Sequence, residues 1–237
     1  MPIGKFSEFS SGSSPFVILV AYATNHTQTV RQHIKMNRFI IIIVTLLLLS
    51  CSSKPNYIGI QPYGKIDQKI IDSVSGILKR AYNLEVLILE GKKLPKNAFV
   101  NIKSPRYRAD SLLVDLVNNR PDSINYLIGI TSKDISTTKR DSKGNIKQPE
   151  SKYLDWGIFG LGYKPGVSCV ISTYRLNNVK SDLFISRVQK IAVHEIGHNM
   201  GLDHCETEKC VMQDAVETIT TVDTEGFELC EKCHRKL

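Results

Sequence analysis

Apolar residues recur along the chain with two different periods, and each period predicts one type of secondary structure. Short apolar runs rich in β-branched residues and bounded by glycine or proline predict strands. Segments with apolar residues at every third or fourth position predict helices. The expected strands cover residues 57–60, 84–89, 124–130, 157–162 and 167–173, and the expected helices cover 66–82, 109–117 and 181–200. Strands that alternate with helices indicate a layered α/β domain.

The composition fits one compact domain and argues against a protein that binds nucleic acid. Of the 237 residues 42% are hydrophobic, and 31 basic and 23 acidic residues give a formal net charge of +8. Part of this charge lies in the first fifty residues and the rest is scattered, whereas a nucleic-acid site needs a basic patch. The densest basic stretch, from Lys133 to Lys152, also holds acidic and hydroxyl residues and therefore predicts a solvated loop.

A targeting segment is expected near the start of the chain. A short basic region begins at Met36, an eleven-residue apolar run ends at Leu49, and a small residue follows. This order predicts a secretory signal peptide over residues 36–50, because the run is shorter than the roughly 20 residues of a membrane-spanning helix. We therefore expect Met36 to be the true start and residues 1–35 to be an over-extended gene model.

The end of this segment predicts a lipid anchor. The run Leu48-Leu49-Ser50-Cys51 resembles a bacterial lipobox, in which the cysteine is lipidated and becomes the mature N-terminus. Cys51 is then the lipidation site and residues 51–56 are a soluble tether. According to this hypothesis, the lipid on Cys51 anchors the protein to a bacterial membrane, on the extracytoplasmic side. An ordinary cleaved signal peptide, in which Cys51 has no special role, is the alternative.

One motif predicts a catalytic metal. The sequence HExxH runs from His194 to His198, and residues four apart on an α-helix lie about 40° apart around the axis and about 6 Å apart along it. Both imidazoles can therefore reach one ion, with Glu195 beside it as the general base. Gly201 can end the helix and let the chain turn so that His204 supplies a third nitrogen. Three protein ligands leave a position for water, which is typical of a catalytic zinc.

The surroundings of this motif argue against incidental histidines on a surface helix. The helix is apolar on most sides, so it is expected to be central and buried. Two histidines and a glutamate in such a place need partners, and one metal ion satisfies all three. The apolar residues of this helix are Val188, Ile191, Ala192, Val193, Ile196 and Met200.

The cysteines predict a second metal site. Four residues separate Cys205 from Cys210 and two separate Cys230 from Cys233, a spacing that suits a structural zinc held by four thiolates. A tail this short gains more from a metal than from two small local loops. The alternative is two disulfides, Cys205–Cys210 and Cys230–Cys233, since an exported protein meets oxidising conditions. Cys169 lies in an apolar strand and is expected to be buried without a chemical role.

The segment from His194 to Cys233 resembles the archaemetzincin motif. It reads HExxHxxG, three residues, Cys, four residues, Cys, one residue, Met, seventeen residues, Cys, two residues, Cys. Two upstream segments are also similar to that family, Gly129-Ile130-Thr131 with Asp134 and the run from Ser172 to Leu176. The resemblance spans about residues 57–233 and is weaker toward the N-terminus.

The resemblance implies a fold and a role for each motif residue. The fold would be α/β (α+β), a zincin of the metzincin type with a twisted mixed sheet, two long helices and a zinc-knotted C-terminal subdomain at 202–237. Met212 would form the Met-turn, an apolar floor below the metal, and residues 157–162 would be an edge strand that pairs with a peptide. Two Zn²⁺ would be bound, one by His194, His198 and His204 and one by Cys205, Cys210, Cys230 and Cys233, with Glu195 as the base.

The sequence therefore predicts a monomeric zinc peptidase that hydrolyses peptide bonds with zinc-activated water. No tyrosine follows Tyr174, so the tyrosine that assists some other metzincins is absent. One alternative is a non-catalytic, zinc-containing lipoprotein that binds peptides, although such a protein would not need Glu195. Another is a cysteine–zinc module for nucleic acid, which the export signal and the dispersed charge oppose. Partners are expected to be a peptide or protein substrate and, through the lipid, a membrane.

Overall fold

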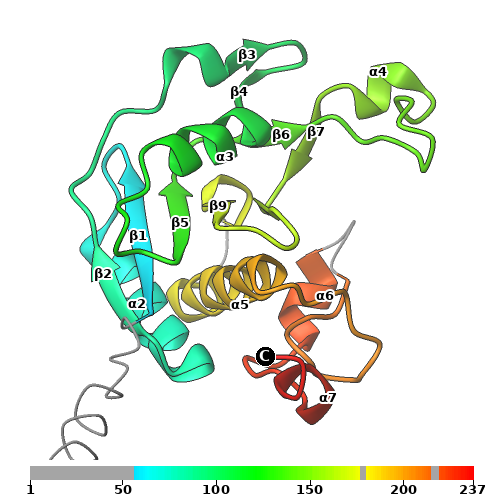
Figure 1. Ribbon diagram of the computed structural model, residues 1–237. Helices are drawn as coiled ribbons and strands as arrows, with labels where there is room; N and C mark the ends of the chain where they lie inside the picture. Colours follow the sequence, from blue (N-terminus) through cyan, green and yellow to red (C-terminus); the bar gives the residue numbers. More distant parts are fainter. Residues whose placement is uncertain (1–55, 177–179, 215–218) are drawn as a thin grey trace, which may run out of the picture. The chain divides into compact units, whose positions relative to one another are not determined.

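The computed structural model describes residues 56–176, 180–214 and 219–237 (Figure 1). The expected over-extended start, signal peptide and Cys51 lie outside the described residues, as does all of the tether except Asn56. Within the described ranges, no helix has the length and apolar character needed to cross a bilayer. The expected boundaries at residues 35, 50 and 56 remain predictions.

The principal sheet has five strands in the order β2-β1-β5-β9-β8 (Figure 1). Four of them are parallel, and β8 pairs antiparallel with β9 at one edge. This is the mixed sheet that the resemblance implies. Its strands are β1 (Tyr57–Tyr63), β2 (Glu85–Ile88), β5 (Tyr126–Thr131), β8 (Gly160–Gly162) and β9 (Ser168–Ser172).

β1 is longer than the predicted strand, which was expected to end before Pro62. Within a strand the N–H and the C=O of one residue point to the same side, and the carbonyl of Pro62 accepts a hydrogen bond from the backbone N–H of Lys92 at 3.0 Å. The missing N–H of Pro62 therefore lies beyond the end of β2 at Ile88, where no ladder hydrogen bond is lost.

Helices cover both faces of this sheet, and successive side chains along a strand point to opposite faces. Cys169 and Ile171 of β9 pack into the core with α2 (Gln68–Tyr82) and α5 (Ser181–Asn199), whereas Val170 packs into the core with α3 (Ala109–Asn118). Such strands are apolar on both faces, which explains their unbroken hydrophobic runs. α2 and α5 are the two long helices expected, and Cys169 is fully buried as predicted.

A second sheet of four short strands, β3-β4-β6-β7, was not predicted. β6 (Ile135–Thr137) and α4 (Glu150–Tyr153) lie in the stretch expected to be loop, and the predicted strand 157–162 is divided at Phe159 between the two sheets. Strands of three or four residues are too short to show a period in the sequence. The other elements before α5 are 3₁₀ helices η1 (Lys96–Ala98) and η2 (Tyr174–Leu176) and strands β3 (Phe99–Asn101), β4 (Pro105–Arg108) and β7 (Trp156–Ile158).

The described residues after α5 form two short helices and loops, and they pack on the same core. This segment contains α6 (Ile219–Thr224), which lies beside the C-terminal end of α5, and α7 (Glu231–His234), which lies below α5 in Figure 1. Leu202, Val211, Met212, Val222 and Leu229 are buried in the cluster that also contains α5. α5 begins at Ser181, the first residue of the predicted range, with Lys180 as its N-cap. Its end is as predicted, because Gly201 has a φ of 93°.

Candidate metal centre

Three imidazoles converge at the C-terminal end of α5. His194 and His198 lie one turn apart on one face of the helix, and the left-handed Gly201 turns the chain so that His204 comes back beside them. One ring nitrogen of each lies within 4.8 Å of one ring nitrogen of the others. The ring centroids are 4.6, 4.9 and 5.3 Å apart. The geometry therefore brings the three predicted ligands together.

Backbone carbonyls fix the two helical imidazoles. Nδ1 of His194 lies 2.8 Å from the carbonyl of Val211, and Nδ1 of His198 lies 2.8 Å from the carbonyl of Leu202. Since a carbonyl only accepts, each Nδ1 carries the proton and donates it. The lone pair of each neutral ring is then on Nε2, which is the atom left to bind a metal.

A carboxylate orients the third imidazole. Nδ1 of His204 lies 3.4 Å from Oδ2 of Asp214, which is two residues after Met212. A carboxylate behind a metal-binding histidine raises the basicity of the ring and fixes its direction. The sequence analysis missed Asp214. Its only signal is an acidic residue close to the Met-turn, and nothing in the spacing indicates that it would face His204.

Burial keeps the helical imidazoles in the form that metals need. Burial first, and the neighbouring His198 second, lower the pKa of His194 to about 3. Burial also lowers the pKa of His198. Both rings are therefore neutral at pH 7, and neutral imidazole is the form that coordinates zinc. The donor set fits a zinc ion with three nitrogen ligands.

Glu195 lies next to these rings, packed against β8. It is 8% exposed, and burial raises its pKa to about 8. A Cβ atom added to Gly160 would lie 2.6 Å from its Oε1, and one added to Gly162 would lie 3.2 Å from its Oε2. The two glycines therefore give the carboxyl group its room. No hydrogen bond or ion pair to another described residue holds the Glu195 side chain.

Met212 is fully buried below the helix and connects the two clusters. A Cβ atom on Gly197 would lie 2.5 Å from its sulfur atom, so the helix and the methionine can approach only because residue 197 is glycine. The carbonyl of Met212 accepts a hydrogen bond from the backbone N–H of Cys205 at 2.8 Å. Met212 thus packs as a floor under α5, the position that the resemblance implied.

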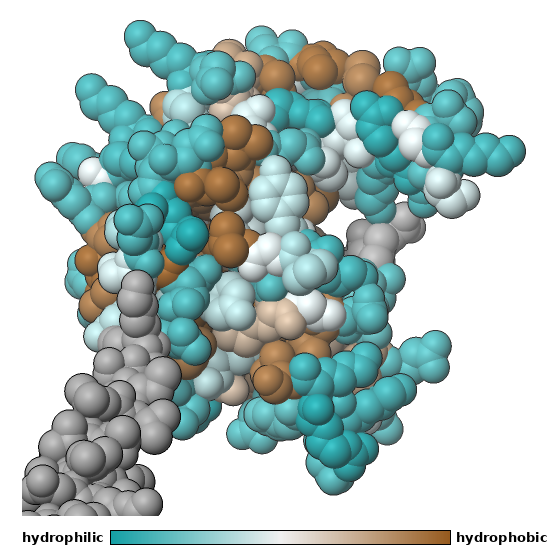
Figure 2. Space-filling view, viewed as in Figure 1, coloured by the Kyte–Doolittle hydropathy of each residue, from teal (hydrophilic) through white to brown (hydrophobic). Residues whose placement is uncertain are grey.

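A cleft of about 640 Å³ opens above the imidazoles. β7 and β8 line one side, and α5 with the end of α6 lines the other. Figure 2 shows the surface hollowed between the part that carries α4 and β7 and the part that carries α6. His194, Glu195, His198 and His204 all line this cleft, together with Asp214 and Glu225. Its size suits several residues of a peptide.

Arg175, in η2, holds the upper wall of the cleft in place. Its guanidinium donates to both carboxylate oxygens of Asp134 at 2.7 and 2.8 Å, and Arg106 donates to the same carboxylate at 2.8 Å. A Cβ atom on Gly157 would overlap this guanidinium, so β7 can lie against it only with glycine there. The resemblance singled out the segments of Asp134 and Arg175, but their ion pair appears only in the fold.

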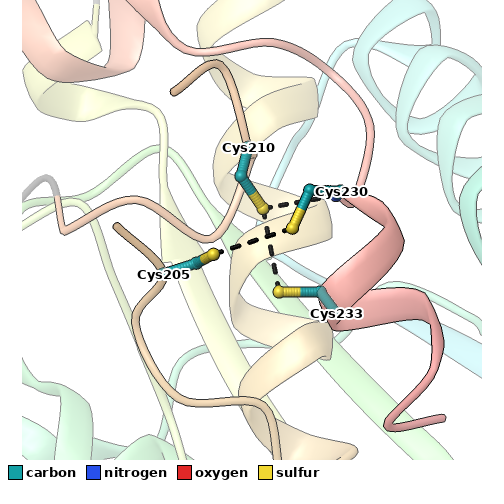
Figure 3. A group of neighbouring side chains, drawn as sticks. All are labelled: Cys205, Cys210, Cys230 and Cys233. Atoms are coloured by element: carbon teal, nitrogen blue, oxygen red, sulfur yellow. Dashed lines mark hydrogen bonds between the residues drawn. The ribbon is translucent and has the colours of Figure 1, made fainter. Parts of the chain in front are cut away.

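The four predicted cysteines form a second cluster. Sγ of Cys205 lies 3.7 Å from Sγ of Cys230, Sγ of Cys210 lies 3.8 Å from Sγ of Cys233, and all four sulfur atoms lie within 4.8 Å of one another (Figure 3). Four thiolates about 2.3 Å from one zinc ion are about 3.8 Å apart in a tetrahedron. The donor set and spacing therefore fit zinc. These four cysteines are free, so neither Cys205–Cys210 nor Cys230–Cys233 forms a disulfide.

A helix that presents two imidazoles and a carboxylate below a glycine-containing edge strand, with a third imidazole after a glycine turn, is the arrangement of a zincin, a class of zinc metallopeptidases. The model of peptidase family M54 matches residues 52–237. The chain belongs to peptidase family M54, the archaemetzincins, and is a zinc metallopeptidase. The family, the enzyme class and the zinc requirement expected from the sequence are thereby confirmed.

Relatives and solved structures agree with this assignment. The chain is 32% identical over 190 residues to the archaemetzincin of Haloarcula marismortui, which covers 76% of this chain and 99% of that protein. It is 33% identical over 189 residues to the archaemetzincin of Haloquadratum walsbyi, with 76% and 98% covered. The crystal structure of archaemetzincin from Archaeoglobus fulgidus, complexed with malonate, has a TM-score of 0.61 at 27% identity and covers 76% of this chain and 99% of its own. That from Methanopyrus kandleri has a TM-score of 0.63 at 25% identity, with 79% and 98% covered.

Proposed function

We propose that His194, His198 and His204 hold one zinc ion and that Glu195 is the general base for hydrolysis of a peptide bond. The observation that carries this proposal is a set of three imidazoles, two of them with Nδ1 bonded to a carbonyl, next to a buried carboxyl group that has no partner among the described residues. Zinc, when bound, supplies a Lewis acid that lowers the pKa of water to about 7 and polarises a scissile carbonyl.

Glu195 moves the proton. Burial raises the pKa of Glu195 to about 8 in the metal-free site, and a zinc ion beside it would lower that pKa and favour the carboxylate, the form that can take a proton from water and pass it to the leaving amine. Gly160 and Gly162 leave its oxygens close to the edge strand. Since no tyrosine follows Tyr174, the protonated form of Glu195 also has to help stabilise the oxyanion.

The edge strand β8 is the surface on which we propose that the substrate binds. It pairs with β9 through Leu161 opposite Val170, and it is the last strand of its sheet. Its outer edge can therefore pair with an extended peptide through main-chain hydrogen bonds. Because Gly160 and Gly162 touch Glu195, a peptide on this edge would present a carbonyl to the catalytic group.

The cysteine cluster is proposed to hold a second, structural zinc. Its spacing leaves no position for water among four sulfur ligands, and Cys210 and Cys233 are buried. A closed four-thiolate site adds stability to a segment that has only two short helices. The total of two zinc ions per chain follows from this assignment.

We also propose that the mature protein begins at a lipidated Cys51 and acts, as a monomer, on peptides or proteins outside a bacterial cytoplasm. The motif around Cys51 supports this location, and the scattered charge opposes a role with nucleic acid. Cell fractionation of the Cys51→Ser variant tests the anchor. The variant should move from the membrane to the soluble fraction, whereas an unchanged distribution would indicate an ordinary signal peptide.

The experiment that tests the reaction is Glu195→Gln in the zinc-loaded protein, assayed against a diverse peptide library with metal analysis. We expect turnover to fall by about 10²–10⁴-fold while the zinc content stays unchanged, because the amide keeps the shape of the carboxyl group but cannot take the proton. Glu228→Gln, at an exposed position, is the control and should behave as the wild type. Unchanged turnover in Glu195→Gln would refute the general base. Zinc-loaded wild type that binds peptides without cutting them would favour a non-catalytic peptide-binding lipoprotein.

A further inference from the structure

The cleft contains a second buried carboxyl group that the proposed reaction does not use. Glu225 directly follows α6 and lines the cleft, but it is only 4% exposed. Its Oε2 atom is fully buried, with no hydrogen-bond partner among the residues that the structure describes. No ion pair within 4.0 Å holds Glu225 to another described residue. A buried carboxylate without a partner is unfavourable, so its position calls for a ligand that is absent from the free protein.

The cations near Glu225 already have other partners. The ammonium group of Lys190 donates to the carbonyls of Val222 and Asp223 at 2.8 and 3.3 Å. The guanidinium of Arg187 makes two hydrogen bonds to the carboxylate of Asp223, each of 2.7 Å. Burial consequently raises the pKa of Glu225 to about 8, although the charge of Lys190 acts in the opposite direction. A cation that pairs with this carboxyl group would therefore have to enter through the cleft.

The wall beside Glu225 is aliphatic. Ile191 lies three residues before His194 on the same face of α5, and Val222 lies three residues before Glu225 in α6, a helix that packs against α5. All four line the cleft. Ile191 and Val222 are nearly buried, at 5% and 1% exposed, so the cleft offers the edges of two aliphatic side chains and a carboxyl group in its lining next to the metal centre. Lysine and arginine side chains have the matching form, an alkyl stem with a cationic end.

We propose that Glu225 is a specificity-determining residue that binds the cationic side chain of a lysine or arginine next to the cleaved bond, with Ile191 and Val222 against its stem. This inference rests on the proposed peptidase function and adds the class of substrate. The cation would arrive with the substrate, and the buried carboxylate would then have a direct cationic partner, which no other described residue supplies within 4.0 Å. A substrate without such a side chain would leave Glu225 buried and unpaired, which is the basis of discrimination.

The test uses peptide pairs that differ only in lysine or norleucine at one position near the scissile bond. For the zinc-loaded wild type, we expect kcat/KM to favour lysine by at least about tenfold at one position, and Glu225→Gln to reduce this preference to about twofold or less. Glu228→Gln is the matched control, because it removes the same charge three residues away at an exposed position. It should retain the preference. Loss of preference in both variants, or retention in both, would overturn the inference.

A binding measurement separates this inference from the proposed function. In the zinc-loaded Glu195→Gln protein, calorimetry should show the lysine peptide binding at least about tenfold tighter than the norleucine peptide, with the difference lost when Glu225→Gln is added. If wild type cuts none of the peptides, the reaction proposal fails, and this binding ratio still decides the role of Glu225. If wild type cuts both peptides of each pair equally well and binding is equal, only the role of Glu225 fails. Equal binding would mean that Glu225 serves the packing around Lys190.

Discussion

The histidine cluster and the cysteine cluster are neighbours in sequence but are built in different ways. Two of the histidines lie on a helix of 19 residues, and Nδ1 of each ring donates a hydrogen bond of 2.8 Å to a backbone carbonyl oxygen. Two of the cysteines lie in the loop after α5 and two lie at α7, a helix of four residues. The backbone N–H groups of Thr207 and Cys230 lie 3.4 Å from the sulfur atoms of Cys205 and Cys210, and the sulfur–sulfur contacts are 3.7 and 3.8 Å. One cluster opens on a cleft, whereas the other is closed.

The difference concerns what holds each set of ligands in position. The histidine cluster is arranged by the fold, because α5 and the turn at Gly201 place the rings before any metal arrives. The cysteine cluster is built from a loop and a single turn of helix, and a cation would stabilise its four thiols, gathered within 4.8 Å, as thiolates. We infer that metal at the histidines serves chemistry, and that metal at the cysteines serves the fold.

The largest effect is expected when the cysteine cluster is broken. Cys233→Ser should remove one zinc per chain and lower the free energy of unfolding by more than about 3 kcal/mol, since the binding energy of a structural zinc is folding energy. Activity should fall as well, because Cys205 directly follows His204. Metal analysis and thermal unfolding measure both results.

The control for this experiment is Cys169→Ala. Cys169 is equally buried but lies in β9, away from the cluster, so its substitution should leave both zinc ions bound. If Cys233→Ser instead kept two zinc ions and its full stability, the cysteine cluster would not be a metal site. The contrast between a catalytic and a structural metal site would then be wrong.

A smaller effect is expected when a ring in the histidine cluster loses its orienting group. Asp214→Asn should weaken zinc binding by about 10–100-fold, the usual effect of removing a carboxylate behind a metal-binding histidine, while the free energy of unfolding stays nearly unchanged. The reason is the 3.4 Å approach of Asp214 Oδ2 to His204 Nδ1. Competition with a chelator measures the affinity.

Asp203→Asn is the matched control. Asp203 is also an exposed carboxylate and precedes His204 directly, but it pairs with Lys164. Its substitution should change zinc affinity by less than about twofold. Equal losses in the two variants would mean that general negative charge, not orientation of the ring, assists metal binding.

The elements that could be predicted from the sequence are those whose hydrophobic pattern extends over many residues. α2, α3, α5 and the buried strands of the principal sheet lie close to their expected positions, because apolar residues repeat over ten or more positions or form an unbroken run. β3, β4, β6 and β7 were missed, since three or four residues fix no period. The break at Phe159 was also missed, because it depends on which sheet each half of the segment joins.

The candidate site divides in the same way. The ligands and Glu195 were found because helical geometry and motif spacing act over short distances in sequence. Asp214 and Glu225 were not found, and Arg175 was named only within a segment similar to the family, without a role, because each acts through a partner or a cleft that the tertiary structure creates. Spacing therefore predicts which residues can bind a metal, and burial decides which other residues face it.

The most gradual effect, spread over several pH units, should appear in the pH dependence of the metal-free protein, and it measures the free energy lost by burying Glu195 in the prearranged histidine site. Burial raises the pKa of Glu195 to about 8 from an ordinary value of 4.5. Between these values the folded state holds a proton that the unfolded state releases, so this group makes the protein less stable as the pH rises from 4.5 to 8. Glu195→Gln removes that loss. The variant should therefore gain stability relative to wild type with rising pH, by at most about 1.4 kcal/mol per pH unit.

Urea unfolding of both proteins at pH 5, 6, 7 and 8 measures this difference, and the difference cancels the titration of the cysteines, which both proteins share. Addition of zinc is the control, because a cation beside Glu195 favours its ionised form and should remove the dependence. A difference that stays constant from pH 5 to 8 without metal would mean that the free site does not bury the proton of Glu195. The histidine cluster would then resemble the cysteine cluster, and its arrangement would depend on the metal.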